Sequence, residues 1–158
     1  LLANVLNSRG MVWEALENFE QAKADYNKAI QINPEYGNAY NNRGNIRAKQ
    51  ADYKGAIQDY NRAIELNSQF VEAYCNRGIA RENLGDHSKA LKDFDRAIEL
   101  NPEYIDGYLR RAMLRQDSGD YAGAIWDFDR VIEIAPESKD RIIGYKEHAE
   151  HLQKGVTT

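Results

Sequence analysis

Charged side chains that could bind a ligand or each other recur at a fixed interval along this chain. Four arginines stand 34 residues apart, and an aspartate follows each of them by 16 residues. A guanidinium binds a carboxylate through two parallel hydrogen bonds, whether that carboxylate is internal or on a ligand. Because an unpaired buried charge is costly, we interpret the columns as an internal ladder of ion pairs between helices rather than as ligand capture. A third column, always basic, follows each aspartate by three residues and is expected to join the ladder. The three columns are Arg9, Arg43, Arg77 and Arg111; Asp25, Asp59, Asp93 and Asp127; and Lys28, Arg62, Arg96 and Arg130.

Groups that would indicate catalysis or metal binding are sparse. His148 and His151 lie three residues apart, but no cysteine or third histidine is near them in sequence, so we interpret them as solvated side chains. Cys75 is interpreted as a small lining residue, and His87 as core packing or turn cover. No nucleophile with its base and no phosphate loop appears. The sequence predicts no enzyme activity, no cofactor and no metal site.

The overall composition narrows the choice of partner and compartment. The formal net charge of −4 argues against nucleic acid, which needs a basic surface. No apolar run approaches the roughly 20 residues of a membrane-spanning helix, and no secretory leader is visible. One cysteine provides no internal disulfide framework. We therefore expect the cytoplasm or another reducing compartment, without membrane insertion.

The interval of 34 residues belongs to a repeat that covers most of the chain. Its four copies are Ala3–Tyr36, Gly37–Phe70, Val71–Tyr104 and Ile105–Ser138. Position 8 of each copy is small, position 20 is alanine and position 24 is aromatic, a spacing typical of closely packed amphipathic helices. Asparagine or aspartate at position 16 is expected to cap a second helix. A proline at position 32 in three copies is expected to end it. Each copy therefore predicts a pair of helices.

This pattern resembles the tetratricopeptide repeat family from residue 3 to residue 138. The departures are Leu6 in place of an aromatic residue, Glu17 and Ala51 in place of a turn glycine, and arginine where position 7 is usually leucine. The resemblance implies an all-α fold, a right-handed superhelical solenoid of antiparallel helix pairs. Residues 139–154 are predicted to form a capping helix, since a repeat array needs a polar-backed cap. Residues 155–158 are predicted to be a frayed tail, and residues 1–158 to form a single domain.

The family also implies that the first helix of each pair lines a concave groove, which we expect to hold an extended peptide or a helix of another protein. Asparagine dominates the first half of this groove, and its amide both donates and accepts, as an extended peptide backbone requires. We expect an adaptor or assembly-factor module, and the sequence does not indicate a homo-oligomer. Arginines at position 11 of three repeats, Arg47, Arg81 and Arg115, are expected to reach the groove. The predicted peptide-binding residues are Asn7, Asn38, Asn41, Asn42, Asn45, Lys49, Asn76, Ile79, Asn83, Leu109, Arg110 and Met113.

Two alternatives remain open at this point. An asparagine-lined array could be the interaction domain of a larger enzyme that resembles a glycosyltransferase. Some family members instead hold the carboxylate tail of a heat-shock chaperone in a clamp of two lysines, two asparagines and an arginine. Asn45, Asn76 and Arg110 match that clamp, whereas Asn41 and Asp106 stand where its lysines should be. A clamp without either lysine is expected to be weak.

Overall fold

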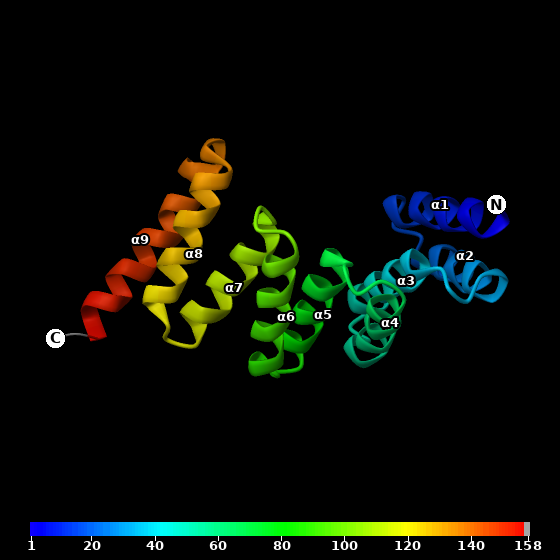
Figure 1. Cartoon of the computed structure of the whole chain (residues 1–158), viewed down its shortest axis with the longest axis horizontal. Coiled ribbons are helices and arrows are strands. Elements are labelled where there is room, and N and C mark those ends of the chain that lie inside the picture. The colour runs from blue at the N-terminus through cyan, green and yellow to red at the C-terminus, as the bar shows by residue number, and fades with distance from the viewer. Residues whose placement is uncertain (157–158) are drawn as a thin grey trace. The chain divides into compact units, whose positions relative to one another are not determined.

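The computed structural model describes residues 1–156, and the regular structure in them is helical (Figure 1). The first four helices are two pairs, α1 and α2 from the first repeat and α3 and α4 from the second. Residues 157 and 158, the end of the predicted frayed tail, lie outside the described residues. The last helix continues to Val156, two residues beyond the predicted end. The elements are α1 (Leu2–Ala15), α2 (Phe19–Ile32), α3 (Gly37–Lys49), α4 (Tyr53–Leu66), α5 (Val71–Asn83), α6 (His87–Leu100), α7 (Ile105–Asp117), α8 (Tyr121–Ile134), the short 3-10 helix η1 (Pro136–Ser138) and α9 (Lys139–Val156).

The helices form two compact units that divide after Asp86. In the first unit α1 packs on α2 and α3 on α4, while α2 and α4 also pack on the first helix of the following repeat. In the second unit α7 packs on both α6 and α8, and α8 lies beside α9 (Figure 1). Within each unit, a second helix therefore packs on the first helix of its own repeat, on that of the next repeat, or on both.

Polar side chains at position 16 start the second helices, as predicted. The Asp52 carboxylate accepts from the Gly55 N–H at 2.9 Å, and the Asp120 carboxylate from the Gly123 N–H at 3.0 Å. Asn18 does the same for α2. Each bond satisfies one of the N–H groups that a helix leaves unpaired at its N-terminus. The predicted caps are therefore confirmed at these three helices.

Aromatic side chains at position 24 fill the space between the paired helices. Tyr26 and Tyr60 are fully buried, and each ring lies against the glycine at position 8 of its own repeat. A Cβ atom on Gly44 would lie only 2.6 Å from Cε1 of Tyr60, which is closer than packed atoms come. The small residue at position 8 therefore makes room for the ring, and the ring sets the spacing of the two helices.

The turn between paired helices keeps one backbone conformation even where its glycine is absent. Gly85 and Gly119 have φ angles of 78° and 83°, and Glu17 and Ala51 occupy the same place with φ angles of 57° and 60°. A side chain makes this left-handed region unfavourable by about 1–2 kcal/mol. The first two repeats therefore hold a strained turn that the last two relieve with glycine.

Replacing Ala51 by glycine is accordingly expected to stabilise the protein. Glycine removes the cost of the left-handed conformation. It also makes the unfolded chain more flexible, which lowers stability by about 0.4–1 kcal/mol. Because the first effect is larger, the free energy of unfolding should rise by about 0.5–1 kcal/mol. Chemical denaturation of both proteins measures this change. Gln50→Gly is the control, because Gln50 has an ordinary φ of −86° and should lose stability. Equal shifts for the two variants would contradict the strain.

Candidate functional site

A row of hydrogen-bonded asparagines crosses the first helices of the first unit. Nδ2 of Asn42 on α3 donates to Oδ1 of Asn7 on α1 at 3.0 Å. Nδ2 of Asn76 on α5 donates to Oδ1 of Asn41 at 3.2 Å and to Oδ1 of Asn45 at 3.1 Å. These bonds join side chains 31 to 35 residues apart in sequence. We call the five residues Asn7, Asn41, Asn42, Asn45 and Asn76 the asparagine ladder.

The members of the ladder differ in burial, so some support their neighbours and others present their amides to solvent. Asn7 and Asn41 are only 4% and 6% exposed, so they hold their neighbours in place more than they face solvent. Asn42, Asn45 and Asn76 are half-buried. The helices thus present three amides whose orientation is set by the other two.

The presenting amides retain unused hydrogen-bonding capacity. Oδ1 of Asn45 accepts from Asn76 and from the Tyr60 hydroxyl at 2.9 Å, while its Nδ2 donates to none of the described residues. In Asn76 the oxygen is the unused group: its Nδ2 donates to Asn41 and Asn45, while its Oδ1 accepts from none of the described residues. Two bonded neighbours therefore offer one donor and one acceptor, the pair that a peptide unit needs.

The remaining predicted groove residues of the first unit are not part of the ladder. Asn38 is exposed, and Ile79 is half-buried. Nδ2 of the exposed Asn83 donates back to the Ile79 carbonyl at 2.8 Å. Nζ of Lys49 binds the Glu14 carboxylate at 2.7 Å and lies over the Phe19 ring. Lys49 is thus already paired within the protein.

Three predicted groove residues belong to α7 in the second unit. Leu109 is half-buried and packs against the core cluster that contains Phe128. Arg110 is exposed and Met113 is half-buried. Of these three residues, only Arg110 is both charged and exposed.

In the first, second and fourth repeats the arginine and aspartate columns form ion pairs, as interpreted from the sequence. Nε and Nη2 of Arg9 bind the two oxygens of Asp25 at 2.6 and 2.7 Å. Arg111 holds Asp127 in the same way at 3.0 and 2.6 Å. The hydrogen bonds from Arg9 lower the pKa of Asp25, although burial opposes the shift. These arginines are structural in the described repeats.

Nη1 of Arg43, Arg77 and Arg111 reaches the preceding repeat, a contact that was not predicted from the sequence. Nη1 of Arg43 donates to Oδ1 of Asn27 at 2.8 Å, and Nη1 of Arg111 binds Asp95 at 2.6 Å. The acceptor is always at position 25, where every repeat has asparagine or aspartate, a regularity that could have revealed it. Nζ of Lys146 on α9 binds Asp129, the last member of that column, at 2.6 Å. Lys146 of α9 thus contacts position 25 of the preceding repeat as the arginine of a first helix does.

Two expectations about the other basic columns were wrong. Arg62 pairs with Glu65 three residues later on its own helix, and Arg130 does the same with Glu133, so these residues do not join the ladder of ion pairs. Nη1 of Arg47 binds Asp59 at 3.0 Å rather than reaching toward a groove. Arg115 is held by Asp127 in the same way. Asp59 and Asp127 are buried, and each binds two arginines because a carboxylate removed from water needs several charged hydrogen-bond donors.

Comparison with protein families accounts for this architecture. Family models described as Tetratricopeptide repeat match residues 3–36, 25–58, 71–104 and 105–138, and a model described as TPR repeat matches residues 44–85. The chain belongs to the tetratricopeptide repeat family. The predicted family and its all-α fold class are therefore confirmed.

Solved tetratricopeptide structures resemble this chain closely. The first TPR of Spaghetti (RPAP3), bound to the HSP90 peptide SRMEEVD, is 27% identical with a TM-score of 0.71, over 73% of this chain and 92% of that one. The Arabidopsis OM64 TPR domain is also 27% identical, with a TM-score of 0.72 over 73% and 96% of the two chains. A structure of MamA, 20% identical, aligns over 97% of this chain and 88% of that one with a TM-score of 0.76. No curated protein matches the sequence.

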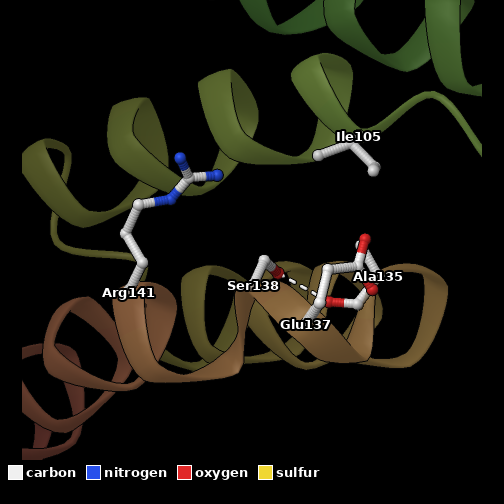
Figure 2. A pocket seen from close by; sticks show the side chains of 5 residues that line it. All are labelled: Ile105, Ala135, Glu137, Ser138 and Arg141. Carbon is white, nitrogen blue, oxygen red and sulfur yellow. Dashed lines mark hydrogen bonds between the residues drawn. The ribbon is translucent and has the colours of Figure 1, made fainter.

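This tetratricopeptide chain also has a pocket of about 360 Å³ in its second unit (Figure 2). It lies where α7 begins and α8 passes through η1 into α9, and none of the predicted groove residues lines it. The Arg141 side chain extends from α9 toward α7, while Oγ of Ser138 donates to the Ala135 carbonyl at 2.7 Å. Its other lining residues are Ile105 and Glu137.

Other sites considered from the sequence are not assembled by the tetratricopeptide fold in residues 1–156. His148 and His151 are exposed, and no group of three metal-ligating side chains occurs in the described part of the chain. His87 is exposed, so its interpretation as core packing was wrong. Cys75 is buried, so its interpretation as a lining residue was wrong as well. No described helix is long and apolar enough to cross a membrane.

Proposed function

We propose that this tetratricopeptide module binds an extended segment of another protein across the asparagine ladder. The observation that carries the proposal is the donor on Asn45 beside the acceptor on Asn76. An extended segment has one unpaired N–H and one unpaired C=O in each peptide unit, and this pair satisfies both. Because Asn41 is buried and bonded to Asn76, the presenting amides do not have to be ordered when the segment binds.

The related structures support a protein partner, and the side chains here favour a neutral mode of recognition. The RPAP3 domain holds a peptide with two glutamates and an aspartate. In this chain Asn41 and Asp106 stand where a carboxylate clamp needs lysines, and Asp106 is an exposed acid. A carboxylate tail bound there would therefore face the neutral Asn41 amide and the negative charge of Asp106 in place of two lysines. We infer that the segment is held mainly through its backbone.

The proposal predicts that binding depends on the ladder and little on salt. A peptide selected from a displayed library on the wild-type protein would be measured against Asn42→Ala combined with Asn76→Ala. We expect a loss of about 1–3 kcal/mol, because truncation leaves peptide groups unpaired. The affinity should change little between low and high salt, since no charge pair is screened. Fluorescence anisotropy gives the dissociation constants.

The matched control replaces two exposed asparagines outside the ladder, Asn38 and Asn83, by alanine and should leave affinity nearly unchanged. Denaturation of each variant separates loss of binding from loss of folding. If Arg110→Ala alone weakens binding, and the peptide needs a free carboxylate, the clamp replaces the ladder as the site. If the control pair matters as much as the ladder pair, the proposed site is wrong.

A further inference from the structure

The turn that leads from α8 into α9 lacks an aromatic residue that the three earlier turns between repeats have. Tyr36, Phe70 and Tyr104 end the first three repeats, whereas the fourth ends in Ser138. A second exchange accompanies the first, three residues further on. That place has alanine or glycine after each aromatic residue, and Arg141 after Ser138. The last junction therefore has a small residue where the others have a ring, and a long residue where the others have a small one.

The aromatic ring occupies a defined place in the junctions that have it. Tyr36 packs against a cluster that contains Ala3 of α1, Ala39 of α3 and residues of α2. Tyr104 makes the corresponding contact, because a Cβ atom on Gly107 would lie 3.2 Å from Cδ1 of its ring. The ring therefore lies where a second helix ends and two consecutive first helices begin, over the small residue three positions later.

In the last junction the pocket of about 360 Å³ lies at this place (Figure 2). Its lining residues are Ile105, Ala135, Glu137, Ser138 and Arg141. Ile105 has the place in its repeat that Ala3 has in the first, and Arg141 has the place of Ala39. An apolar cavity of about 150 Å³ can already hold a benzene ring. The pocket is therefore large enough for the aromatic ring that this junction lacks.

The two charged residues of the pocket are available to a ligand. Glu137 and Arg141 are four residues apart, a spacing at which opposite charges on a helix pair. Both are exposed, and neither makes an ion pair or a side-chain hydrogen bond within residues 1–156. The Ser138 hydroxyl, in contrast, already donates to the Ala135 carbonyl at 2.7 Å. The pocket thus combines the apolar surface of Ile105 and Ala135 with one cationic donor and one anionic acceptor.

We propose that this pocket receives an aromatic side chain, tyrosine or phenylalanine, from a segment of a partner protein. The ring would take the place that Tyr36 and Tyr104 have in the earlier junctions, against Ile105 and Ala135. The guanidinium of Arg141 would lie over the ring, as three other arginines of this chain lie over tyrosine rings.

The charges at the pocket favour a peptide segment over a small aromatic molecule. A residue that carries a ring also has a backbone N–H and a backbone C=O beside it. Glu137 can accept from such an N–H and Arg141 can donate to such a C=O, whereas a bare aromatic ring forms neither bond. The pocket lies in the second unit and the asparagine ladder in the first, so binding at each can be tested separately.

N-acetyl-tyrosine amide is the probe for this site, because it carries one aromatic ring between two peptide groups. Added to the isotope-labelled wild-type chain, it should shift the amide NMR signals of Ile105, Ser138 and Arg141 saturably, with a Kd of about 1 mM. N-acetyl-leucine amide, which lacks the ring, should bind at least about threefold more weakly. So should p-cresol, which lacks the peptide groups, by about the same factor. Equal affinity for p-cresol would make the occupant a small aromatic molecule and overturn the proposal.

Variants of the pocket distinguish this binding from adhesion of a ring to the surface. Ser138→Phe combined with Arg141→Ala restores the pattern of the earlier junctions, so the new ring should fill the pocket and abolish the saturable shifts. Arg141→Ala alone leaves the pocket open and should weaken binding at least about threefold. The matched control, Ser88→Phe, adds a ring at an exposed serine of α6 and should leave the affinity unchanged.

Thermal denaturation establishes that each of these variants folds. The Arg141→Ala result stands by itself, because it changes one exposed side chain and does not depend on folding of the double variant. The proposal fails if the probe does not bind, or if its saturable shifts fall outside the pocket. It also fails if Arg141→Ala or the folded double variant binds as the wild type does, or if Ser88→Phe weakens binding as much as Arg141→Ala.

Discussion

Phe128→Ala is expected to lower the free energy of unfolding by about 3–5 kcal/mol. The Phe128 ring is fully buried at the centre of a core cluster built by α7, α8 and α9. The same cluster contains Ala112 of α7 and Ile142 and Ala149 of α9, and the Phe128 ring stacks on that of Tyr145 with the ring centroids 6.1 Å apart. Removing it leaves a cavity that three helices border, and rigid helix backbones close such a cavity only in part.

Trp126, two residues earlier on the same helix, is the control for this change. Its ring is larger but 53% exposed, and it contacts Tyr108 at the surface. Trp126→Ala should therefore cost only about 1 kcal/mol. Urea denaturation followed by circular dichroism compares the two variants. Equal losses of stability in the two variants would show that burial of the Phe128 ring does not hold α9 against α7 and α8.

Arg111→Met is expected to destabilise the protein by about 3–5 kcal/mol, because it removes the main partner of a buried charge. Asp127 is 0% exposed, and Arg111 supplies two of its hydrogen bonds while also binding Asp95 across the interface with α6. Methionine keeps the aliphatic bulk but offers no donor. Arg115 remains as a single partner for Asp127 at 2.8 Å, which places the loss toward the lower end of this range.

Arg9→Met removes the same kind of ion pair at an exposed place and should cost much less. The Arg9 side chain is 55% exposed, so in this variant water can reach the Asp25 carboxylate and replace much of the hydrogen bonding that the guanidinium supplied. Thermal denaturation of both variants at one salt concentration compares the losses. A loss for Arg9→Met as large as that for Arg111→Met would mean that burial does not set the strength of these pairs.

The helices and their pairing within each repeat were predictable from local sequence spacing. Small, aromatic and capping residues recur with the repeat, so the helices and the faces they bury follow from local spacing. The ion pairs of Arg9 and Arg111 were also predictable, because each pairs with the aspartate 16 residues later in its own helix pair. The geometry of one repeat decides these contacts, and each repeat contains the full pattern.

The polar atoms that keep unused hydrogen-bonding capacity could not be predicted from the sequence. The sequence identified the asparagines but not that Asn7 and Asn41 are buried supports, nor that Asn45 keeps a donor where Asn76 keeps an acceptor. Those outcomes depend on distances between first helices of different repeats, which small shifts in helix packing can change by more than a hydrogen bond tolerates. Burial of the position-3 and position-10 side chains likewise depends on a neighbouring helix, so Val5 and Ala39 have the same place in the repeat and opposite exposure. Periodicity assigns a side chain to a face of its helix, and the helix packed against that face decides whether the side chain is core or surface.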